Sequence, residues 1–264
     1  MSSTQQGPFV LVSGANRGIG LNLVSAFLEK TPSAIIFAGA RDPTKATELN
    51  ELAKKHPNNI HVIKLVADDA ESNKAAVEDV KKVTDRLDVV IANAGIGSGP
   101  SEVHTDDISL YKSTFEVNTL GPLHLYQATY PLLIASRTSG TASKDLPAPK
   151  FFITSSGLGS LGAFFSTFIL TPYGTSKAAV NYVALAIHHQ TEDAGAVVIP
   201  YHPGLVMTDM GPKEADSFSH IPNMPRAITA EQSAKDYVDL VDRSTRAEHG
   251  GKFWGQGSSE PYPW

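Results

Sequence analysis

The chain has 264 residues, of which 41% are hydrophobic and 19% are charged, and its formal net charge is −5. This size and composition fit one large α/β domain and argue against a disordered chain. The sequence contains no cysteine, which excludes disulfides, thiolate catalysis and cysteine-ligated metal centres. It also has no basic tract, no signal-peptide stretch and no apolar run of the ~20 residues that a membrane helix needs, so we expect a cytoplasmic protein with no nucleic-acid or membrane partner.

Short apolar runs alternate with longer amphipathic ones. After a polar leader at 1–7, predicted to be disordered, the expected elements in chain order are strand 9–13, a helix to about 30, strand 34–39, helix 44–56, strand 61–66, helix 72–87, strand 88–92, helix 106–136, strand 151–155, helix 173–191, strand 196–202, helix 229–246 and strand 252–254. Thr44 is the expected N-cap of its helix and Pro57 its stop, and helix 106–136 should be interrupted near Gly121-Pro122.

This alternation predicts a doubly wound Rossmann fold, with a mostly parallel sheet of about seven strands flanked by helices. One such domain accounts for residues 1–264. Two polar, proline-containing segments break the rhythm, at 137–150 and 211–226. We expect the second, which holds Phe218 and Met224, to be a mobile lid that selects the substrate. The alternative is an ordinary surface loop.

A glycine-rich turn follows the first strand. Gly14, Gly18 and Gly20 would let the backbone approach a pyrophosphate at the start of the next helix, with the intervening residues Asn16, Arg17 and Ile19 around it. The spacing G-x-x-x-G-x-G differs from that of other dinucleotide folds, and alone it also suits an ordinary strand–helix turn.

The end of the second strand bears on which dinucleotide binds. Ala40 stands where an NAD site places an acidic residue, and Arg41 follows it. A small residue and an arginine would accommodate a 2′-phosphate, with Arg17 approaching from the other side, so NADP(H) is the expected cofactor. Asp42 is the counter-evidence, because with a shifted register it would face the ribose and favour NAD. Both arginines could also be solvated surface charges.

Tyr173 and Lys177 are four residues apart at the start of a predicted helix, which places them on one face. An ammonium beside the phenol would lower the pKa of the tyrosine toward neutrality and suit it to acid–base catalysis. Such a pair is common by chance on a surface helix.

Several motifs follow one another along the chain in an order that makes it resemble the short-chain dehydrogenase/reductase superfamily over nearly its whole length. Besides the glycine-rich turn and the Tyr173/Lys177 pair, the motifs are Asn93-Ala94-Gly95, Asn118, Ser155-Ser156 and Pro203-Gly204. Within that superfamily, Gly251-Lys252-Phe253 and the ending 261–264 are similar to those of sniffer-type carbonyl reductases and C-factor-like proteins. The chain resembles fungal norsolorinic acid ketoreductase-like proteins most of all. That resemblance implies an aromatic polyketide ketone as substrate.

The resemblance also implies four catalytic roles. Tyr173 would donate the proton in reduction, and Lys177 would lower its pKa and bind the nicotinamide ribose. Asn118 would hold a water that relays protons to Lys177, and Ser156 would orient the substrate carbonyl.

The remaining implied contacts are with the cofactor. Asn93, Ala94 and Gly95 would line the adenosine side and Asp68 would contact adenine, although Asp68 and Asp69 could equally be a helix-start carboxylate pair. The segment with Pro203, Gly204, Val206 and Thr208 would lie against the nicotinamide, with Thr208 binding its carboxamide.

The sequence departs from the family pattern in two places. Tyr173 follows Ser156 by 17 positions, where about thirteen are usual, and the extra length falls in the apolar stretch 163–170. That stretch would form a lip of the substrate pocket, a subunit contact or part of the core. The second departure is Ala92, which replaces the first asparagine of the motif that continues with Asn93-Ala94-Gly95. The choice of Ser156 is also ambiguous, since Ser155 and Ser160 are close to it in the sequence.

These observations predict an NADPH-dependent ketoreductase acting on a small carbonyl or alcohol substrate, as a homodimer or homotetramer. The alternatives are an NAD-dependent alcohol dehydrogenase and a non-catalytic NADP(H) sensor. The nine histidines show no metal-ligand spacing, so we read them as core or surface residues and expect no metal.

Overall fold

The computed structural model describes residues 7–100, 102–135, 146–221 and 224–264. Its centre is a seven-stranded sheet in the order β3-β2-β1-β4-β5-β6-β9, with every neighbouring pair parallel. The strands are β1 (Phe9–Val12), β2 (Ile35–Ala40), β3 (Ile60–Lys64), β4 (Val89–Ala92), β5 (Lys150–Thr154), β6 (Val197–His202) and β9 (Trp254–Gly255). The predicted Rossmann fold is confirmed. The leader expected at 1–7 lies, except for Gly7, outside the described residues.

Both faces of the sheet are buried, which explains why the strands are apolar throughout. Along β1, Val10 and Val12 pack into one hydrophobic cluster, and Phe9 and Leu11 pack into another. Alternate residues of a strand point to opposite faces, so each strand contributes to two separate cores.

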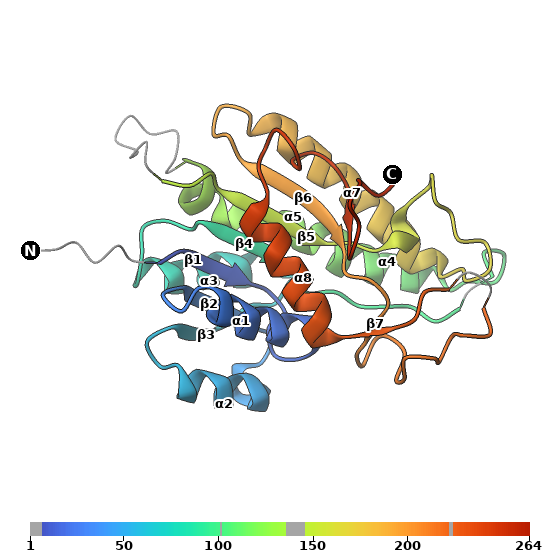
Figure 1. The fold of residues 1–264 in the computed structure, drawn as a ribbon, viewed down its shortest axis with the longest axis horizontal. Helices are drawn as coiled ribbons and strands as arrows, with labels where there is room; N and C mark the ends of the chain where they lie inside the picture. Colours follow the sequence, from blue (N-terminus) through green and yellow to red (C-terminus); the bar gives the residue numbers. More distant parts are fainter. Residues whose placement is uncertain (1–6, 101, 136–145, 222–223) are drawn as a thin grey trace, which may run out of the picture.

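Helices cover the two faces as separate layers (Figure 1). The first cluster receives side chains from α1 (Gly18–Lys30), α2 (Thr47–Lys55) and α8 (Ala230–Arg243). The second receives them from α3 (Ala70–Lys81), α5 (Gly121–Tyr130) and α7 (Thr171–Gln190). Among the helices of the described residues, none combines the length and the apolar character needed to span a bilayer.

The start of the helix after β2 differs from the prediction. Asp42, and not Thr44, is the cap: its carboxylate accepts hydrogen bonds from the N–H of Thr44 at 3.1 Å and from its hydroxyl at 2.6 Å. It begins a short 3-10 helix, η1 (Pro43–Lys45), and α2 starts only at Thr47. Proline suits the first helical position because that position needs no N–H donor, so Pro43 favours a helical start one residue earlier than expected.

The long helix that we expected over 106–136 is interrupted by a wider turn and not by a break. A π-helical turn, η2 (Glu116–Leu120), joins α4 (Ile108–Phe115) to α5, and a second one, η3 (Pro131–Ala135), follows α5. Pro122, the second residue of α5, has no N–H to donate to the preceding turn, and its ring crowds the carbonyl four residues earlier. The wider turn relieves this conflict, and it contains Asn118.

A small parallel ladder that the sequence did not predict closes the base of the loop after β6. It pairs β7 (Val206–Met207) with β8 (Ile228–Thr229), which directly precedes α8. The two ends of the loop that contains 211–226 are thereby held together. A further short 3-10 helix, η4 (Gly157–Gly159), follows β5.

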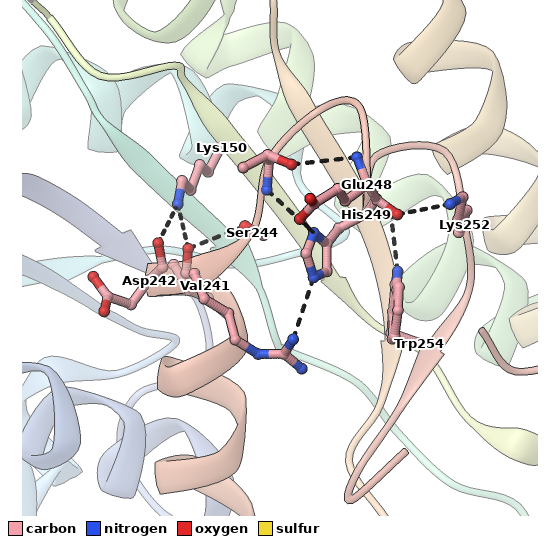
Figure 2. A network of polar contacts seen from close by, with 10 residues as sticks. Lys150, Val241, Asp242, Ser244, Glu248, His249, Lys252 and Trp254 are labelled. Atoms are coloured by element: carbon pink, nitrogen blue, oxygen red, sulfur yellow. Dashed lines mark hydrogen bonds and ion pairs between the residues drawn. The ribbon is translucent and has the colours of Figure 1, made fainter. Parts of the chain in front are cut away.

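The carboxyl end of α8 is held against the start of β5 by the polar network of Figure 2. The ammonium of Lys150 donates to the main-chain carbonyls of Val241 and, at 3.0 Å, Asp242. Burial lowers the pKa of Lys150. A cation at this position satisfies carbonyls that the helix leaves free and opposes the negative end of its dipole.

We therefore expect Lys150→Met to lower the free energy of unfolding by about 1–3 kcal/mol, because two charge-assisted hydrogen bonds are lost. Lys252→Met is the matched control: its exposed ammonium donates to a single carbonyl, that of Glu248, at 2.7 Å, and its loss should cost less than about 0.5 kcal/mol. Urea unfolding of both variants measures the difference. Equal losses would show that Lys150 does not anchor α8.

Candidate active site

A cleft of about 710 Å³ opens at the carboxyl ends of the strands, where a doubly wound sheet places its ligands. It brings together segments that are far apart in the sequence: the turn after β1, the ends of β2, β4, β5 and β6, and the start of α7. The predicted site residues that line it are Gly14, Asn16, Arg17, Gly18, Ile19, Gly20, Arg41, Asn93, Gly95, Ser156, Tyr173, Lys177, Pro203, Gly204, Val206 and Thr208.

Three predicted residues lie outside this lining. Ala94 packs behind the glycine-rich turn, where a Cβ on Gly14 would lie 2.9 Å from its Cα. Asp68 is exposed, and its neighbour Asp69 is the residue that caps α3, accepting from the N–H groups of Glu71 and Ser72. Asn118 is fully buried. The adenine contact of Asp68 therefore stays a prediction.

The glycine-rich turn has the shape of a phosphate cradle. Gly14 has a φ of +65°, in the left-handed region that favours glycine, and a Cβ on Gly20 would overlap the carbonyl of Gly14. Helix α1 begins at Gly18, with no acidic residue in its first turn and no side-chain hydrogen bond from its N-cap, Arg17. Its first N–H groups and the positive end of its dipole suit an anion, so these residues fit a dinucleotide pyrophosphate.

Asn93 braces this turn, a role that the sequence did not reveal. Its side-chain amide donates to the carbonyls of Ser13 at 3.1 Å and Gly14 at 3.3 Å. The Ser13 hydroxyl in turn accepts from the N–H groups of Asn93 and Ala94, each at 3.0 Å. The ends of β1 and β4 are thus fixed to one another, and the cradle is held in shape before any ligand binds.

Positive side chains gather where β2 ends. Arg41 is exposed and lines the cleft, as does Lys45, a cation that the sequence analysis did not single out. Asp42 also borders the cleft, but its carboxylate caps η1 and lies 3.4 Å from the Lys45 ammonium. The Thr44 hydrogen bond, followed by Lys45, lowers the pKa of Asp42. Asp42 therefore has structural partners within its own turn, which weakens the case that it binds a ribose.

Arg17 belongs to the cradle itself, as the N-cap residue of α1, and it lines the cleft. Its guanidinium forms an ion pair of 2.8 Å with Asp209, which follows β7. Both side chains are largely exposed, so the pair contributes little to stability and can exchange for a stronger anion.

The structure separates the three candidate serines. Ser155 turns inward, and its hydroxyl donates to Asn181 Oδ1 at 2.6 Å. The Ser160 hydroxyl donates to the carbonyl of Pro263, also at 2.6 Å. Ser155 and Ser156 both border the cleft, but the hydroxyl that forms a hydrogen bond with the phenol of Tyr173 is that of Ser156.

Tyr173 and Lys177 come together as their spacing predicts. The Lys177 ammonium lies 5.6 Å from the centre of the Tyr173 ring, and it donates to the carbonyl of Thr154 at 2.7 Å. Lys177 is only 4% exposed, and burial lowers its pKa to about 8. At neutral pH the ammonium is still mostly charged.

The pKa of Tyr173 differs from the expectation. Burial raises it above the ordinary value, and the hydrogen bond with Ser156 offsets only part of that rise. Desolvation penalises the phenolate, so the phenol stays protonated at neutral pH. That is the form in which a tyrosine can donate a proton.

The side chain of Asn118 forms hydrogen bonds with two separate segments of the chain. Its Oδ1 accepts from the N–H of Ile96 at 2.8 Å, and its Nδ2 donates to the carbonyl of Ile96 at 2.9 Å and to the Ser176 hydroxyl at 3.0 Å. It therefore ties the loop after β4 to α7, one residue from Lys177. The water relay through Asn118 stays a prediction.

Apolar side chains from two loops form the other end of the cleft. Phe168, from the stretch 163–170, contacts Phe218, from the segment 211–226, with ring centres 5.2 Å apart. The further apolar lining residues of these two loops are Ala163, Phe165, Leu170, Pro212, Met224 and Pro225. The two loops lie at the same end of the molecule (Figure 1). The stretch 163–170 is thus a lip of the cleft, whereas closure of 211–226 as a lid stays a prediction, and its residues 222–223 lie outside the described part.

Two residues that the sequence analysis read as structural or left aside also line the cleft, His202 at the end of β6 and Tyr262 beyond β9. The position of His202 directly before Pro203 was an available signal. The sequence holds no comparable signal that places Tyr262 at the cleft, because its approach depends on the path of the chain after β9.

Comparison with known proteins agrees with this geometry. The family model of short chain dehydrogenases matches residues 8–217. An uncharacterized oxidoreductase of Schizosaccharomyces pombe is 36% identical over 270 residues, covering 99% of this chain and all of that protein.

Among solved structures, the NADPH-bound carbonyl reductase from chicken fatty liver superposes with a TM-score of 0.84 at 29% identity, covering 98% of this chain and 100% of its own. The carbonyl reductase Sniffer of Drosophila melanogaster does so with the same TM-score at 26% identity and the same coverage. The resemblance to sniffer-type carbonyl reductases is confirmed.

The different surroundings of Ser155 and Ser156 lead to a stability prediction. Ser155→Ala should lower the free energy of unfolding by about 1–3 kcal/mol, because it leaves the buried Asn181 Oδ1 without its donor. Ser156→Ala loses the long hydrogen bond from the N–H of Leu158 at the start of η4 and the one with the phenol of Tyr173, and should cost about 0.5 kcal/mol. Chemical unfolding tests this order, and a larger loss for Ser156→Ala would contradict the placement of the two serines.

Proposed function

The chain belongs to the short-chain dehydrogenase family and is an oxidoreductase, and from this premise we propose that it is an NADPH-dependent carbonyl reductase that converts a ketone into a secondary alcohol. One observation carries the proposal: Ser156, Tyr173 and Lys177 meet on the wall of the same cleft as the glycine-rich cradle. Proton transfer and dinucleotide binding would thus take place in one cavity.

The cradle and its cations support NADPH as the cofactor, which when bound supplies the hydride. The N–H groups at the start of α1 would bind the pyrophosphate. Arg41, with Lys45 and Arg17 nearby on the cleft wall, would bind the 2′-phosphate. The capping role of Asp42 favours this reading over NAD. Lys177 would bind the nicotinamide ribose, and Thr208 would bind the carboxamide.

The proton would come from Tyr173. Its raised pKa keeps the phenol protonated until a negative charge develops on the carbonyl oxygen of the substrate. The Ser156 hydroxyl, which is hydrogen-bonded to the phenol of Tyr173, would orient the carbonyl oxygen of the substrate. The buried Lys177 ammonium, close to the Tyr173 ring, would stabilise the phenolate that remains.

The apolar end of the cleft supports a bulky, uncharged substrate. The rings of Phe168 and Phe218 contact one another in the cleft wall, and Met224 adds a flexible, polarizable surface. We therefore propose an aromatic ketone, held by the two loops while its carbonyl reaches Ser156 and Tyr173.

Removal of the Tyr173 hydroxyl tests the chemistry. Tyr173→Phe should lower kcat with NADPH and an aromatic ketone by about 10²–10⁴-fold while NADPH affinity is retained, because only the proton donor is lost. Tyr182→Phe is the control: it removes a phenol hydroxyl from the same helix at a side chain that is 76% exposed. If Tyr173→Phe kept more than about a tenth of the wild-type kcat, the assigned donor would be wrong. A wild type that binds NADPH but reduces no ketone would favour the sensor alternative.

Charge reversal at Arg41 tests the choice of cofactor. Arg41→Asp should weaken NADPH binding by at least about tenfold, because each bond to a charged phosphate contributes about 1.5–3 kcal/mol and the new carboxylate repels it. NADH binding should change much less. Lys112→Asp, at an exposed residue outside the cleft, applies the same change of net charge elsewhere. Fluorescence titration with both cofactors measures the dissociation constants, and equal losses for the two would remove Arg41 from the phosphate site.

A further inference from the structure

The cleft contains a polar pair that the proposed reaction does not use. His202 is the last residue of β6, and Tyr262 lies in the segment after β9. Both line the cleft, and their ring centres are 5.6 Å apart at an interplanar angle of 64°. The loops 163–170 and 211–226 line the cleft mainly with apolar side chains, so this imidazole and phenol differ from them in being able to form hydrogen bonds with a substrate.

This pair lies beside the position of the reacting carbonyl. Gly157 directly follows Ser156, and a Cβ on it would lie 3.0 Å from the Tyr262 hydroxyl oxygen and 3.4 Å from His202 Nε2. The absence of a side chain at Gly157 keeps both polar atoms accessible from the side of Ser156. A group bound there would be only a few bonds away from a carbonyl that Ser156 holds.

The imidazole is suited to an uncharged ligand. Its Nδ1 is buried and has no hydrogen-bond partner among the residues that the structure describes, and its Nε2 is the nitrogen nearer Gly157. Burial lowers the pKa of His202 to about 4, so the ring is neutral at physiological pH. A neutral imidazole and a phenol each exchange hydrogen bonds with a carbonyl or hydroxyl oxygen, but they do not compensate the desolvation of a charged group.

The main chain that carries both side chains is held in place before a substrate arrives. The N–H of Tyr262 donates to the carbonyl of Phe253 at 2.7 Å, and the two rings lie 5.2 Å apart. The carbonyl of His202 accepts from the N–H of Gln256 at 2.8 Å. Because the main chain at both residues needs no ordering on binding, the hydrogen bonds of these side chains can contribute more to substrate choice.

We propose that His202 and Tyr262 form a specificity-determining subsite that binds a second, uncharged oxygen of the substrate. The preferred substrates are then ketones that carry a hydroxyl or a second carbonyl a few bonds from the carbonyl that is reduced. This inference rests on the proposed carbonyl reduction and adds to it the class of ketone.

A matched pair of ketones tests the subsite: 4-hydroxy-4-phenylbutan-2-one and 4-phenylbutan-2-one, which lacks only the hydroxyl. The wild-type enzyme with NADPH should favour the hydroxy ketone about tenfold in kcat/KM, as one or two added hydrogen bonds allow. Tyr262→Phe and His202→Leu should each remove about fivefold of this preference, mainly through KM, and should change the plain ketone less than about twofold.

Two further variants separate recognition from a general structural effect. His202→Gln places an amide nitrogen near the position of Nε2 and should restore most of the preference that His202→Leu loses. Tyr182→Phe, at an exposed position on α7, should leave both ketones unchanged. NADPH affinity, measured by fluorescence titration, should be the same in all variants.

Equal kcat/KM values for the two ketones in the wild type would overturn the subsite, and so would variants that lower both ketones in parallel. Tyr262→Phe decides the question alone if His202→Leu does not fold. A wild type that reduces neither of these ketones, nor any other in a wider panel, would instead overturn the proposed carbonyl reduction itself.

Discussion

The hydrogen bond from the Lys177 ammonium to the carbonyl of Thr154 connects the two halves of the site. The Thr154 hydroxyl lies 3.3 Å from Asn93 Oδ1, and the Asn93 amide donates to the carbonyl of Gly14. A short series of polar contacts thus runs from the helix with the Tyr173/Lys177 pair, through the ends of β5 and β4, to the glycine-rich turn. Because each member is hydrogen-bonded to the next, the position of the Tyr173/Lys177 pair and the shape of the cradle are fixed together.

The buried ammonium also accounts for the electrostatics of the cleft. Desolvation lowers the pKa of Lys177 and raises that of Tyr173, so burial disfavours charge on both partners. The phenol is therefore kept in its neutral form, and the lysine retains most of its positive charge at neutral pH. This combination suits a site in which negative charge forms only as the reaction proceeds.

Much of this arrangement could be predicted from local patterns in the sequence. The alternation of strands and helices determines the parallel sheet, and a spacing of four residues on a helix is enough to place Tyr173 beside Lys177. The choice of Ser156 could not be made in this way. It depends on Asn181, which accepts the hydrogen bond of the Ser155 hydroxyl, and on the carbonyl of Pro263, which accepts that of Ser160 across a separation of 103 residues.

Other features could not be predicted because they depend on helix capping, on the position of a proline within a helix or on the depth of burial of a side chain. In the sequence Asp42 counts against NADP(H), because a shifted register would make it a ribose ligand, but in the structure it caps η1, which begins at Pro43. The long helix is interrupted next to Gly121-Pro122, as the sequence predicts, but the pattern does not specify that the interruption takes the form of a π-helical turn before Pro122. The direction of the Tyr173 pKa shift depends on the depth of burial, which a sequence does not specify.

The two separate cores restrict how such a chain can change its length. Alternate residues of β1 belong to clusters on opposite faces, so one inserted residue would send every later side chain of the strand into the wrong cluster. The loops beyond the carboxyl ends of the strands face no such restriction, since they pack against no second layer. In this chain the additional residues between Ser156 and Tyr173 lie in such a loop, and they line the cleft. Insertions and deletions that the fold can accept therefore fall at the mouth of the cleft, where they alter what can enter it and leave the sheet unchanged.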